Sequence, residues 1–108
     1  MGRFASLRRQ ADFARLRQRG RRISSANLTL YLTDAPASDP TSQVGITVTK
    51  SIGTAVVRNK LRRRLAAIVH ETLAQDRAVR LVVVPRPSAA TLAFDRLRGE
   101  VATALGRR

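Results

Sequence analysis

The stretch that decides the fold spans residues 44–65 and reads VGITVTKSIGTAVVRNKLRRRL. Its first part alternates apolar and polar residues through Val44, Ile46 and Val48, which is the two-residue period of a β-strand. Its last part contains the run RNKLRRR, which carries five positive charges and no carboxylate. The stretch therefore predicts a strand that leads into a strongly basic segment.

The basic segment has the apolar spacing of an α-helix, and Thr54 is suited to cap its first turn. The apolar residues that would share one helical face are Val57, Leu61, Leu65, Ile68 and Val69. No Asp or Glu occurs from Pro40 to His70, so a lattice of internal salt bridges does not explain the charge. We expect the apolar face to anchor the helix and the cations to face a polyanion.

The flanking sequence supplies the other elements of the fold. Residues 10–19 predict a short amphipathic helix that ends at Gly20. The segment NLTLYLT, residues 27–33, alternates strictly and predicts a half-buried strand, which we expect to form a hairpin with the strand at 44–50.

The last third of the chain predicts one more strand and one more helix. Residues 80–87, RLVVVPRP, form a nearly continuous apolar run, typical of a central strand that is covered on both faces. A last helix is expected after Ser88, with Leu97 and Val101 on its apolar face. The predicted order is helix, strand, strand, helix, strand, helix. This order predicts a single α/β domain over residues 1–108, a two-layer sandwich with helices packed on a small sheet.

The charge balance limits the classes of partner. The chain has 21 basic and 7 acidic residues, a formal net charge of +14, which favours binding to nucleic acid. No apolar stretch is long enough for a membrane span or resembles an export signal, so we expect a cytoplasmic protein with no membrane partner. The chain has no Cys and one His, His70, to which we assign no catalytic or metal-binding role.

One motif within the basic segment is more specific than its charge. The pattern RN-x-x-(K/R)-R follows a Gly-x-Ala-Val turn, with DFARLRQRG before it and RLVVVPRP after it. In this setting, over roughly residues 10–100, the chain resembles the protein subunit of bacterial ribonuclease P. The resemblance also implies a left-handed β–α–β crossover around the basic helix, although such crossovers are almost always right-handed.

The resemblance implies a function that the residues alone do not give. The protein would bind a large catalytic RNA and the 5′ leader of precursor transfer RNA, and it would assist removal of that leader. The chemistry would belong to Mg²⁺ bound mainly by the RNA. The chain would then be a non-catalytic subunit of an endoribonuclease, with no catalytic residue and no metal ligand of its own. We infer no protein partner from the sequence.

The same resemblance implies two groups of functional residues. The basic helix would contact the catalytic RNA through Arg58, Asn59, Lys60, Arg62, Arg63 and Arg64. A cleft between the first helix and the sheet would hold the single-stranded leader through Phe13, Arg17, Tyr31 and Lys50. Phe13 could instead only pack in the core. The chain departs from the family pattern at Arg17, where an aromatic residue is frequent, and at Ala66, where a basic residue is common.

Three other functions fit parts of this pattern. A ribosomal or ribosome-associated RNA-binding protein would have the same charge, size and fold, but it would need no cleft for a single strand. A DNA-binding regulator fits less well, because no helix-turn-helix pairing is evident. A free-standing nuclease fits least, because no cluster of carboxylates for two metal ions is visible.

Overall fold

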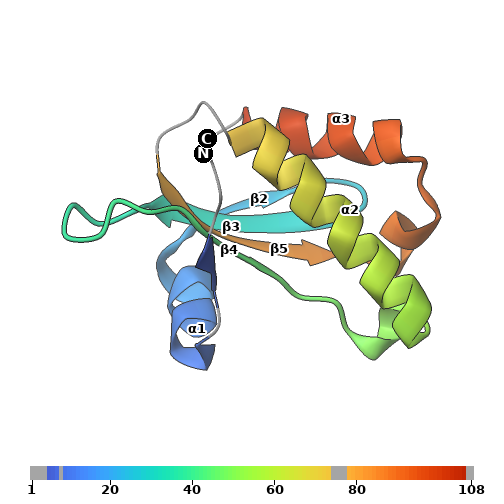
Figure 1. Cartoon of the computed structure of the whole chain (residues 1–108), viewed down its shortest axis with the longest axis horizontal. Helices are drawn as coiled ribbons and strands as arrows, with labels where there is room; N and C mark the ends of the chain where they lie inside the picture. Colours follow the sequence, from blue (N-terminus) through green and yellow to red (C-terminus); the bar gives the residue numbers. More distant parts are fainter. Residues whose placement is uncertain (1–4, 8, 74–77, 107–108) are drawn as a thin grey trace.

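The computed structural model describes residues 5–7, 9–73 and 78–106, which build a sheet with helices on both faces (Figure 1). Its strands are β1 (Ala5–Ser6), β2 (Arg21–Ser24), β3 (Leu28–Asp34), β4 (Gln43–Ile46) and β5 (Val79–Pro85). Its α-helices are α1 (Gln10–Arg19), α2 (Ala55–Leu73) and α3 (Phe94–Leu105). Two 3₁₀ helices, η1 (Lys50–Ile52) and η2 (Pro87–Thr91), precede α2 and α3. The predicted fold class and the predicted order of the main elements are confirmed.

Strand β5 lies at the centre of the sheet, whose order is β1-β4-β5-β3-β2. It pairs antiparallel with β3 over all seven residues and parallel with β4, and Val82 and Val83 are completely buried. The predicted hairpin between residues 27–33 and 44–50 is therefore wrong, because β5 lies between those two strands. Because β5 is buried on both faces, its backbone N–H and C=O groups need hydrogen-bond partners on both edges. Strands β3 and β4 provide these partners.

Two short strands were not predicted from the sequence. Strand β2 pairs antiparallel with β3, and β1 adds a two-residue parallel edge beside β4. In β2, RRIS, only Ile23 is apolar and buried, so its alternation is too short to give a signal. These strands extend the sheet to five strands in the described part of the chain.

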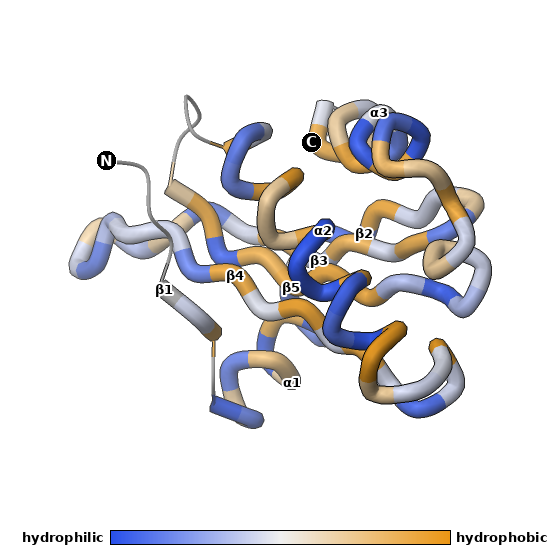
Figure 2. The backbone as a smooth tube through the Cα atoms, turned by 45° about the vertical axis from the view of Figure 1, so that its right-hand side comes forward, coloured by the Kyte–Doolittle hydropathy of each residue, from blue (hydrophilic) through white to orange (hydrophobic). Residues whose placement is uncertain are grey.

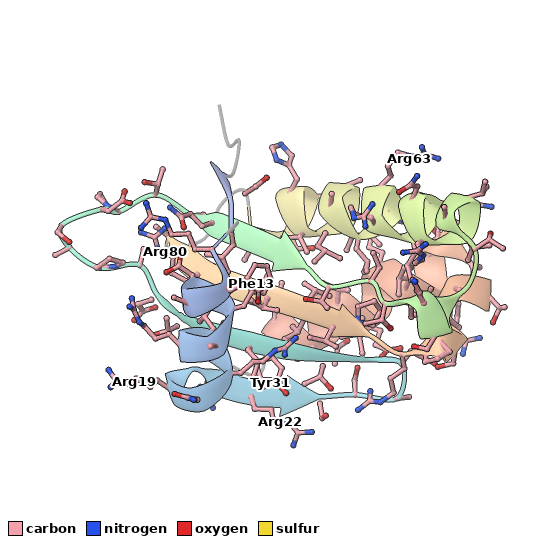
Figure 3. All side chains as sticks on the ribbon, turned by 90° about the horizontal axis from the view of Figure 1, so that it is seen from below. Phe13, Arg19, Arg22, Tyr31, Arg63 and Arg80 are labelled. Atoms are coloured by element: carbon pink, nitrogen blue, oxygen red, sulfur yellow. The ribbon has the colours of Figure 1, made fainter. Side chains whose placement is uncertain are left out.

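The crossover from β4 through α2 to β5 joins two neighbouring parallel strands. Thr54 caps α2 as predicted, because its Oγ1 accepts a hydrogen bond from the Val57 backbone N–H at 3.4 Å. In Figures 1 and 3, α2 lies over the sheet on the side that makes the path from β4 to β5 left-handed. The crossover thus departs from the usual right-handed rule in the way that the resemblance implies.

The alternation of β3 separates two apolar clusters. Leu28, Leu30 and Leu32 point to the face covered by α2 and α3 and belong to the main core. Tyr31 and Val82, paired in register, point to the opposite face, where they meet Leu16 of α1. Full burial of each such leucine stabilises the fold by about 1.5–3 kcal/mol. In Figure 2, hydrophobic residues accordingly concentrate along the central strands.

The last helix begins later than the sequence suggested. Residues 87–91 form η2, and α3 begins at Phe94, so Ser88 does not cap it. Pro87 is favourable in the first turn of a helix, and η2 begins there. The backbone is already extended at Leu92, so the helix that starts at Pro87 is limited to the five residues of η2. Leu97 and Val101 lie on the buried face of α3 as predicted.

Candidate nucleic-acid interface

Helix α2 presents its cations away from the core. Leu61 and Leu65 are 2 % and 0 % exposed, which fixes the orientation of the helix against the sheet. The polar residues of the motif that this orientation leaves exposed are Asn59, Lys60, Arg62 and Arg63. Arg63 points outward in Figure 3, and Figure 2 shows hydrophilic turns along the first half of α2. No acidic residue lies on this segment, so its surface potential is positive.

Arg62 and Asn59 are held together within the motif. Arg62 Nη1 donates a hydrogen bond of 2.7 Å to Asn59 Oδ1, across one helical turn. Because the Asn59 oxygen is used in this way, its NH₂ group is the part that can donate to an outside acceptor. The pair therefore presents a fixed guanidinium next to an amide donor, which suits a phosphate oxygen.

Arg58 and Arg64 differ from the exposed cations of α2. Both are half-buried. Arg64 Nη1 donates to the Leu92 backbone oxygen at 3.1 Å and so ties α2 to the segment before α3. Arg58 Nε is buried and has no hydrogen-bond partner in the described part of the chain. RNA contact by these two arginines stays a prediction, and Arg64 has a structural role that the sequence did not suggest.

The opposite face of the sheet brings Phe13 and Tyr31 into one cluster. Tyr31 in β3 lies beside Val82 in β5, and α1 places Phe13 over the same surface (Figure 3). Both aromatic rings are half-buried, so each contributes to packing and keeps part of its surface exposed. The two interpretations of Phe13, as a core residue and as a stacking platform, are therefore compatible.

Arg17 and Lys50, the other two residues assigned to leader binding, both lie at the surface of the described structure. Arg17 is exposed on α1, about 40° around the helix from Phe13. Lys50 is exposed in η1, between β4 and α2. Neither residue makes a side-chain hydrogen bond or ion pair that fixes it within the cleft in the described structure. Their assignment to leader binding stays a prediction.

A cavity of about 590 Å³ joins the aromatic cluster to the basic helix. Phe13 and Gly45 line one side of it, and Arg62, Ala66 and His70 line the side formed by α2. The small side chain of Ala66 leaves room between Arg62 and His70, which is exposed. The sequence patterns of the first helix and of the basic helix are local to each helix. They did not predict that the two helices meet at this cavity.

Sequence reasoning also missed a polar network at the turn between β2 and β3. Glu100 of α3 accepts hydrogen bonds from the Asn27 backbone N–H at 2.8 Å, from the Asn27 side chain at 2.7 Å and from the Ser25 hydroxyl. Burial raises the pKa of Glu100, but these hydrogen bonds outweigh it and hold the pKa below its ordinary value. Glu100 therefore ties α3 to the sheet as a charged acceptor.

Arg86 completes the same network from the end of β5. Its Nη1 donates to the backbone oxygens of Ser25 and Leu28 at 2.6 and 3.1 Å, and its Nη2 donates to Thr29 Oγ1 at 3.1 Å. Ser24 Oγ and Thr29 Oγ1 are themselves 3.0 Å apart. Because its donors are used internally, Arg86 shapes this end of the sheet.

Metal-binding clusters and membrane-spanning helices are both absent from the described residues. Within residues 5–7, 9–73 and 78–106, no group of three or more His, Cys, Asp or Glu side chains is placed to hold a metal ion. No helix in the same part of the chain is long and apolar enough to cross a membrane.

Comparisons with known proteins agree on one family. The family model for ribonuclease P matches residues 1–108. The ribonuclease P protein component of Acidothermus cellulolyticus is 41% identical over 102 residues, which cover 94% of this chain and 85% of the relative. That of Gluconacetobacter diazotrophicus is 36% identical over 97 residues, which cover 88% of this chain and 83% of the relative.

Solved structures share the fold. The RNase P protein of Staphylococcus aureus aligns with a TM-score of 0.87 at 21% identity, over 97% of this chain and 95% of that one. The RNase P protein from Thermotoga maritima aligns with a TM-score of 0.82 at 23% identity, over 95% and 96% of the two chains.

Proposed function

The chain belongs to the ribonuclease P protein family, and on that premise we propose that it binds the catalytic RNA of ribonuclease P and the 5′ leader of precursor transfer RNA. The family identifies it as a protein component of an endoribonuclease and associates it with transfer RNA processing. The finer assignment, of which surface meets which RNA, rests on the geometry of α2 and α1. The family match favours this function over a purely ribosomal role for the same basic fold.

The basic surface of α2 supports binding to the catalytic RNA. Exposed Lys60, Arg62 and Arg63 lie on a helix whose opposite face is fixed by Leu61 and Leu65 in the core. The helix that carries these cations is already fixed against the core, so binding of a folded polyanion has to order the side chains but not the backbone. Arg also forms bidentate contacts with phosphate.

The half-exposed aromatic pair supports binding of a single-stranded leader. Phe13 and Tyr31 keep ring surface available beside apolar Val82 and Val84. Base stacking on such a platform contributes about 1–3 kcal/mol per base and tolerates different sequences. The cavity between Phe13 and Arg62 gives the leader a path from the aromatic cluster to the basic helix. This continuity is the observation that carries the proposal.

The protein's contribution would be binding and positioning. Mg²⁺, held mainly by the RNA, would supply the activation of water and the stabilisation of the leaving group. Phe13, Tyr31 and the arginines of α2 would hold the leader and the catalytic RNA in one orientation, so that the scissile bond lies near the metal-bearing RNA. Such positioning lowers the entropic part of the barrier.

The proposal is tested by binding of the protein, assembled with a bacterial ribonuclease P RNA, to precursor and to mature transfer RNA. Tyr31→Ala and Phe13→Ala should each weaken precursor binding by about 5- to 150-fold, the range that corresponds to loss of one stacked base. Binding of mature transfer RNA should change little.

Phe94→Ala is the matched control, because Phe94 is another partly exposed aromatic, on α3 and beneath Arg98. It should leave both affinities unchanged. Equal losses for precursor and mature transfer RNA in the Phe13 and Tyr31 variants would remove the leader from this face of the sheet.

A further inference from the structure

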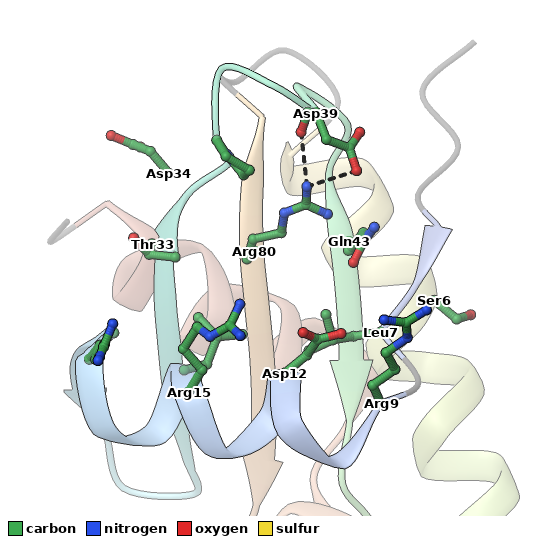
Figure 4. Close-up of a pocket in the computed structure, with 14 residues that line it drawn as sticks. Ser6, Leu7, Arg9, Asp12, Arg15, Thr33, Asp34, Asp39, Gln43 and Arg80 are labelled. Carbon is green, nitrogen blue, oxygen red and sulfur yellow. Dashed lines mark hydrogen bonds and ion pairs between the residues drawn. The ribbon is translucent and has the colours of Figure 1, made fainter.

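A second cavity, of about 730 Å³, lies on the other flank of α1 (Figure 4). Four arginines and three aspartates line it, together with the apolar residues Leu7, Leu16 and Pro36. The charged residues that carry the argument are Arg15 and Arg19 of α1, Arg80 of β5, and Asp39 of the connection between β3 and β4. Neither the basic helix nor the aromatic cluster lines this cavity.

Arg80 is the fixed charge of the cavity. Its side chain is only 12% exposed, and the register of the sheet sets it between Thr33 and Gln43. Nη2 donates to the Asp39 backbone oxygen at 2.9 Å and lies 3.1 Å from Asp39 Oδ2. Nη1 is buried and has no hydrogen-bond partner among the described residues. A buried charged donor without an acceptor is unfavourable, so this guanidinium is only half satisfied.

Asp39 is the movable partner of Arg80. Its side chain is 53% exposed, and the residue belongs to a surface connection, residues 35–42, rather than to a strand. Hydrogen bonds from Thr41 and Arg80 keep the pKa of Asp39 below its ordinary value, so it is ionised at neutral pH. An ion pair with one partner this exposed contributes little stability and is easily exchanged.

This cavity and the aromatic cluster of Phe13 and Tyr31 lie on the same face of the sheet, on opposite sides of α1. Arg80 lies two residues from Val82 along β5, which is about 7 Å. Helix α1 packs on Val82 through Leu16 and so separates the two surfaces. Arg15 and Arg19 lie on the flank of α1 away from Phe13, and Figure 3 shows Arg19 pointing away from Phe13 and Tyr31. A single strand of RNA that ran from Phe13 and Tyr31 across α1 would meet these cations first and Arg80 next.

We propose that this cavity is a phosphate-binding subsite for single-stranded RNA, in which a phosphodiester of the upstream leader displaces Asp39 from Arg80. The subsite rests on the proposed function, because it extends the path of the leader beyond the aromatic cluster. The Asp39 carboxylate engages only Nη2, because its other oxygen accepts a hydrogen bond from Thr41. The two non-bridging oxygens of a phosphodiester can both accept from the guanidinium. Asp39 thus acts as a resident competitor that keeps Arg80 paired when no RNA is bound. Asp12 and Asp34 also line the cavity, and release of Asp39 shifts its balance towards positive charge.

The test uses the protein assembled with ribonuclease P RNA and precursors that carry either a leader of a few nucleotides or a long leader. Arg80→Gln should weaken binding of the long-leader precursor by about 3- to 10-fold and leave the short-leader precursor unchanged. Asp39→Ala should strengthen binding of the long-leader precursor. Arg80→Lys keeps the charge but loses the planar fork, so we expect an intermediate loss.

Asp95→Ala is the matched control for charge. Asp95 is likewise an exposed carboxylate paired with an arginine, Arg98 at 2.8 Å, but it lies on α3. Asp95→Ala removes the same charge as Asp39→Ala. The gain in affinity for the long-leader precursor must therefore be larger in Asp39→Ala than in Asp95→Ala. The gain from Asp39→Ala must also disappear in the Arg80→Gln background, because the competitor has then lost its site.

Each contrary outcome is distinct. Equal effects of Asp39→Ala and Asp95→Ala would overturn the subsite and leave only a general effect of charge. An effect of Arg80→Gln on binding of the catalytic RNA, with none on leader length, would overturn the assignment to the leader. Thermal unfolding of every variant checks folding; if Arg80→Gln does not fold, the Asp39 and Asp95 pair still decides. Loss of precursor binding in Tyr31→Ala with no effect at Arg80 would leave the proposed function standing and reject the subsite alone.

Discussion

The ring of Phe13 lies directly on the backbone of Gly45. A Cβ atom added at Gly45 would come within 2.6 Å of Phe13 Cζ, closer than real side chains approach. Strand β4 thus contributes a surface without a side chain at the point where α1 crosses it, and the aromatic ring occupies that space. Gly45 is therefore needed for the position of Phe13, which lines the cavity leading to α2.

Gly45→Ala should displace Phe13 and lower the free energy of unfolding by about 1–3 kcal/mol, the usual cost of overpacking. It should also weaken binding of leader-bearing precursor more than binding of mature transfer RNA. Gly99→Ala is the control, because nothing lies within 4 Å of a Cβ at this position in α3. That variant should stabilise the protein by about 0.5–1 kcal/mol. Urea unfolding measures the stability change in both variants. Unchanged stability of Gly45→Ala would contradict the close packing of Phe13 on Gly45.

Neutralising Arg58, Arg62 and Arg63 together should weaken binding to the catalytic RNA and reduce its salt dependence. For each phosphate that the variant no longer binds, the slope of log affinity against log salt should fall by about 0.7–0.9. Titrations at several salt concentrations measure this slope. An unchanged slope would exclude this surface of α2 from the RNA interface.

Arg64→Met is the matched control on the same helix. Because Arg64 donates to the Leu92 backbone oxygen, its replacement should lower the unfolding free energy by about 1 kcal/mol. It should change the salt slope less than replacement of the exposed Arg63. A larger change at Arg64 than at Arg63 would mean that the internal hydrogen bond is given up when RNA binds.

Ala66→Phe should block the cavity between α1 and α2. Ala66 is exposed, so a larger side chain should cost little stability. Precursor affinity should fall by about tenfold if the leader uses this path, since the cavity wall then excludes a base. Ala102→Phe, at an exposed position of α3, provides the control for added aromatic surface. Full precursor affinity in Ala66→Phe would place the leader elsewhere.

Glu100 should make folding stability depend on pH in the acidic range. Because its pKa is lower in the folded protein than its ordinary 4.5, its contribution is present above that value and is lost as pH falls through the folded pKa. Glu100→Gln should lower stability at neutral pH by about 1 kcal/mol, since the carboxylate accepts three hydrogen bonds at a partly exposed site. Its thermal midpoint should then fall less than that of the wild type between neutral and acidic pH. Parallel curves for the two proteins would show that Glu100 does not carry this dependence.

Local periodicity in the sequence predicted most elements, but not their neighbours in the sheet. The alternation around Leu30 and the helical spacing of Leu61 and Leu65 each gave a correct element, because burial of one face depends on local period. The hairpin prediction failed because strand partners depend on a distant segment, β5, that inserts between β3 and β4. Ser88 failed as a cap because the chain first forms η2.

The candidate site was predictable as residue types rather than as geometry. The exposed cations of α2 followed from the apolar face of the helix. The hydrogen bond from Arg64 to Leu92 and the pairing of Arg80 with Asp39 join residues that are 28 and 41 positions apart. Sequence periodicity does not predict such contacts, because they depend on how the connecting segments pack against the helices and strands of the folded protein.

The most direct test of the central claim is reconstitution of cleavage. The purified protein is combined with a bacterial ribonuclease P RNA at low Mg²⁺, and removal of the leader from a 5′-extended precursor transfer RNA is followed over time. We expect accurate cleavage at a Mg²⁺ concentration where the RNA alone is poorly active, with less stimulation by Tyr31→Ala. A protein that binds the RNA but leaves both rate and cleavage position unchanged would contradict the proposed function.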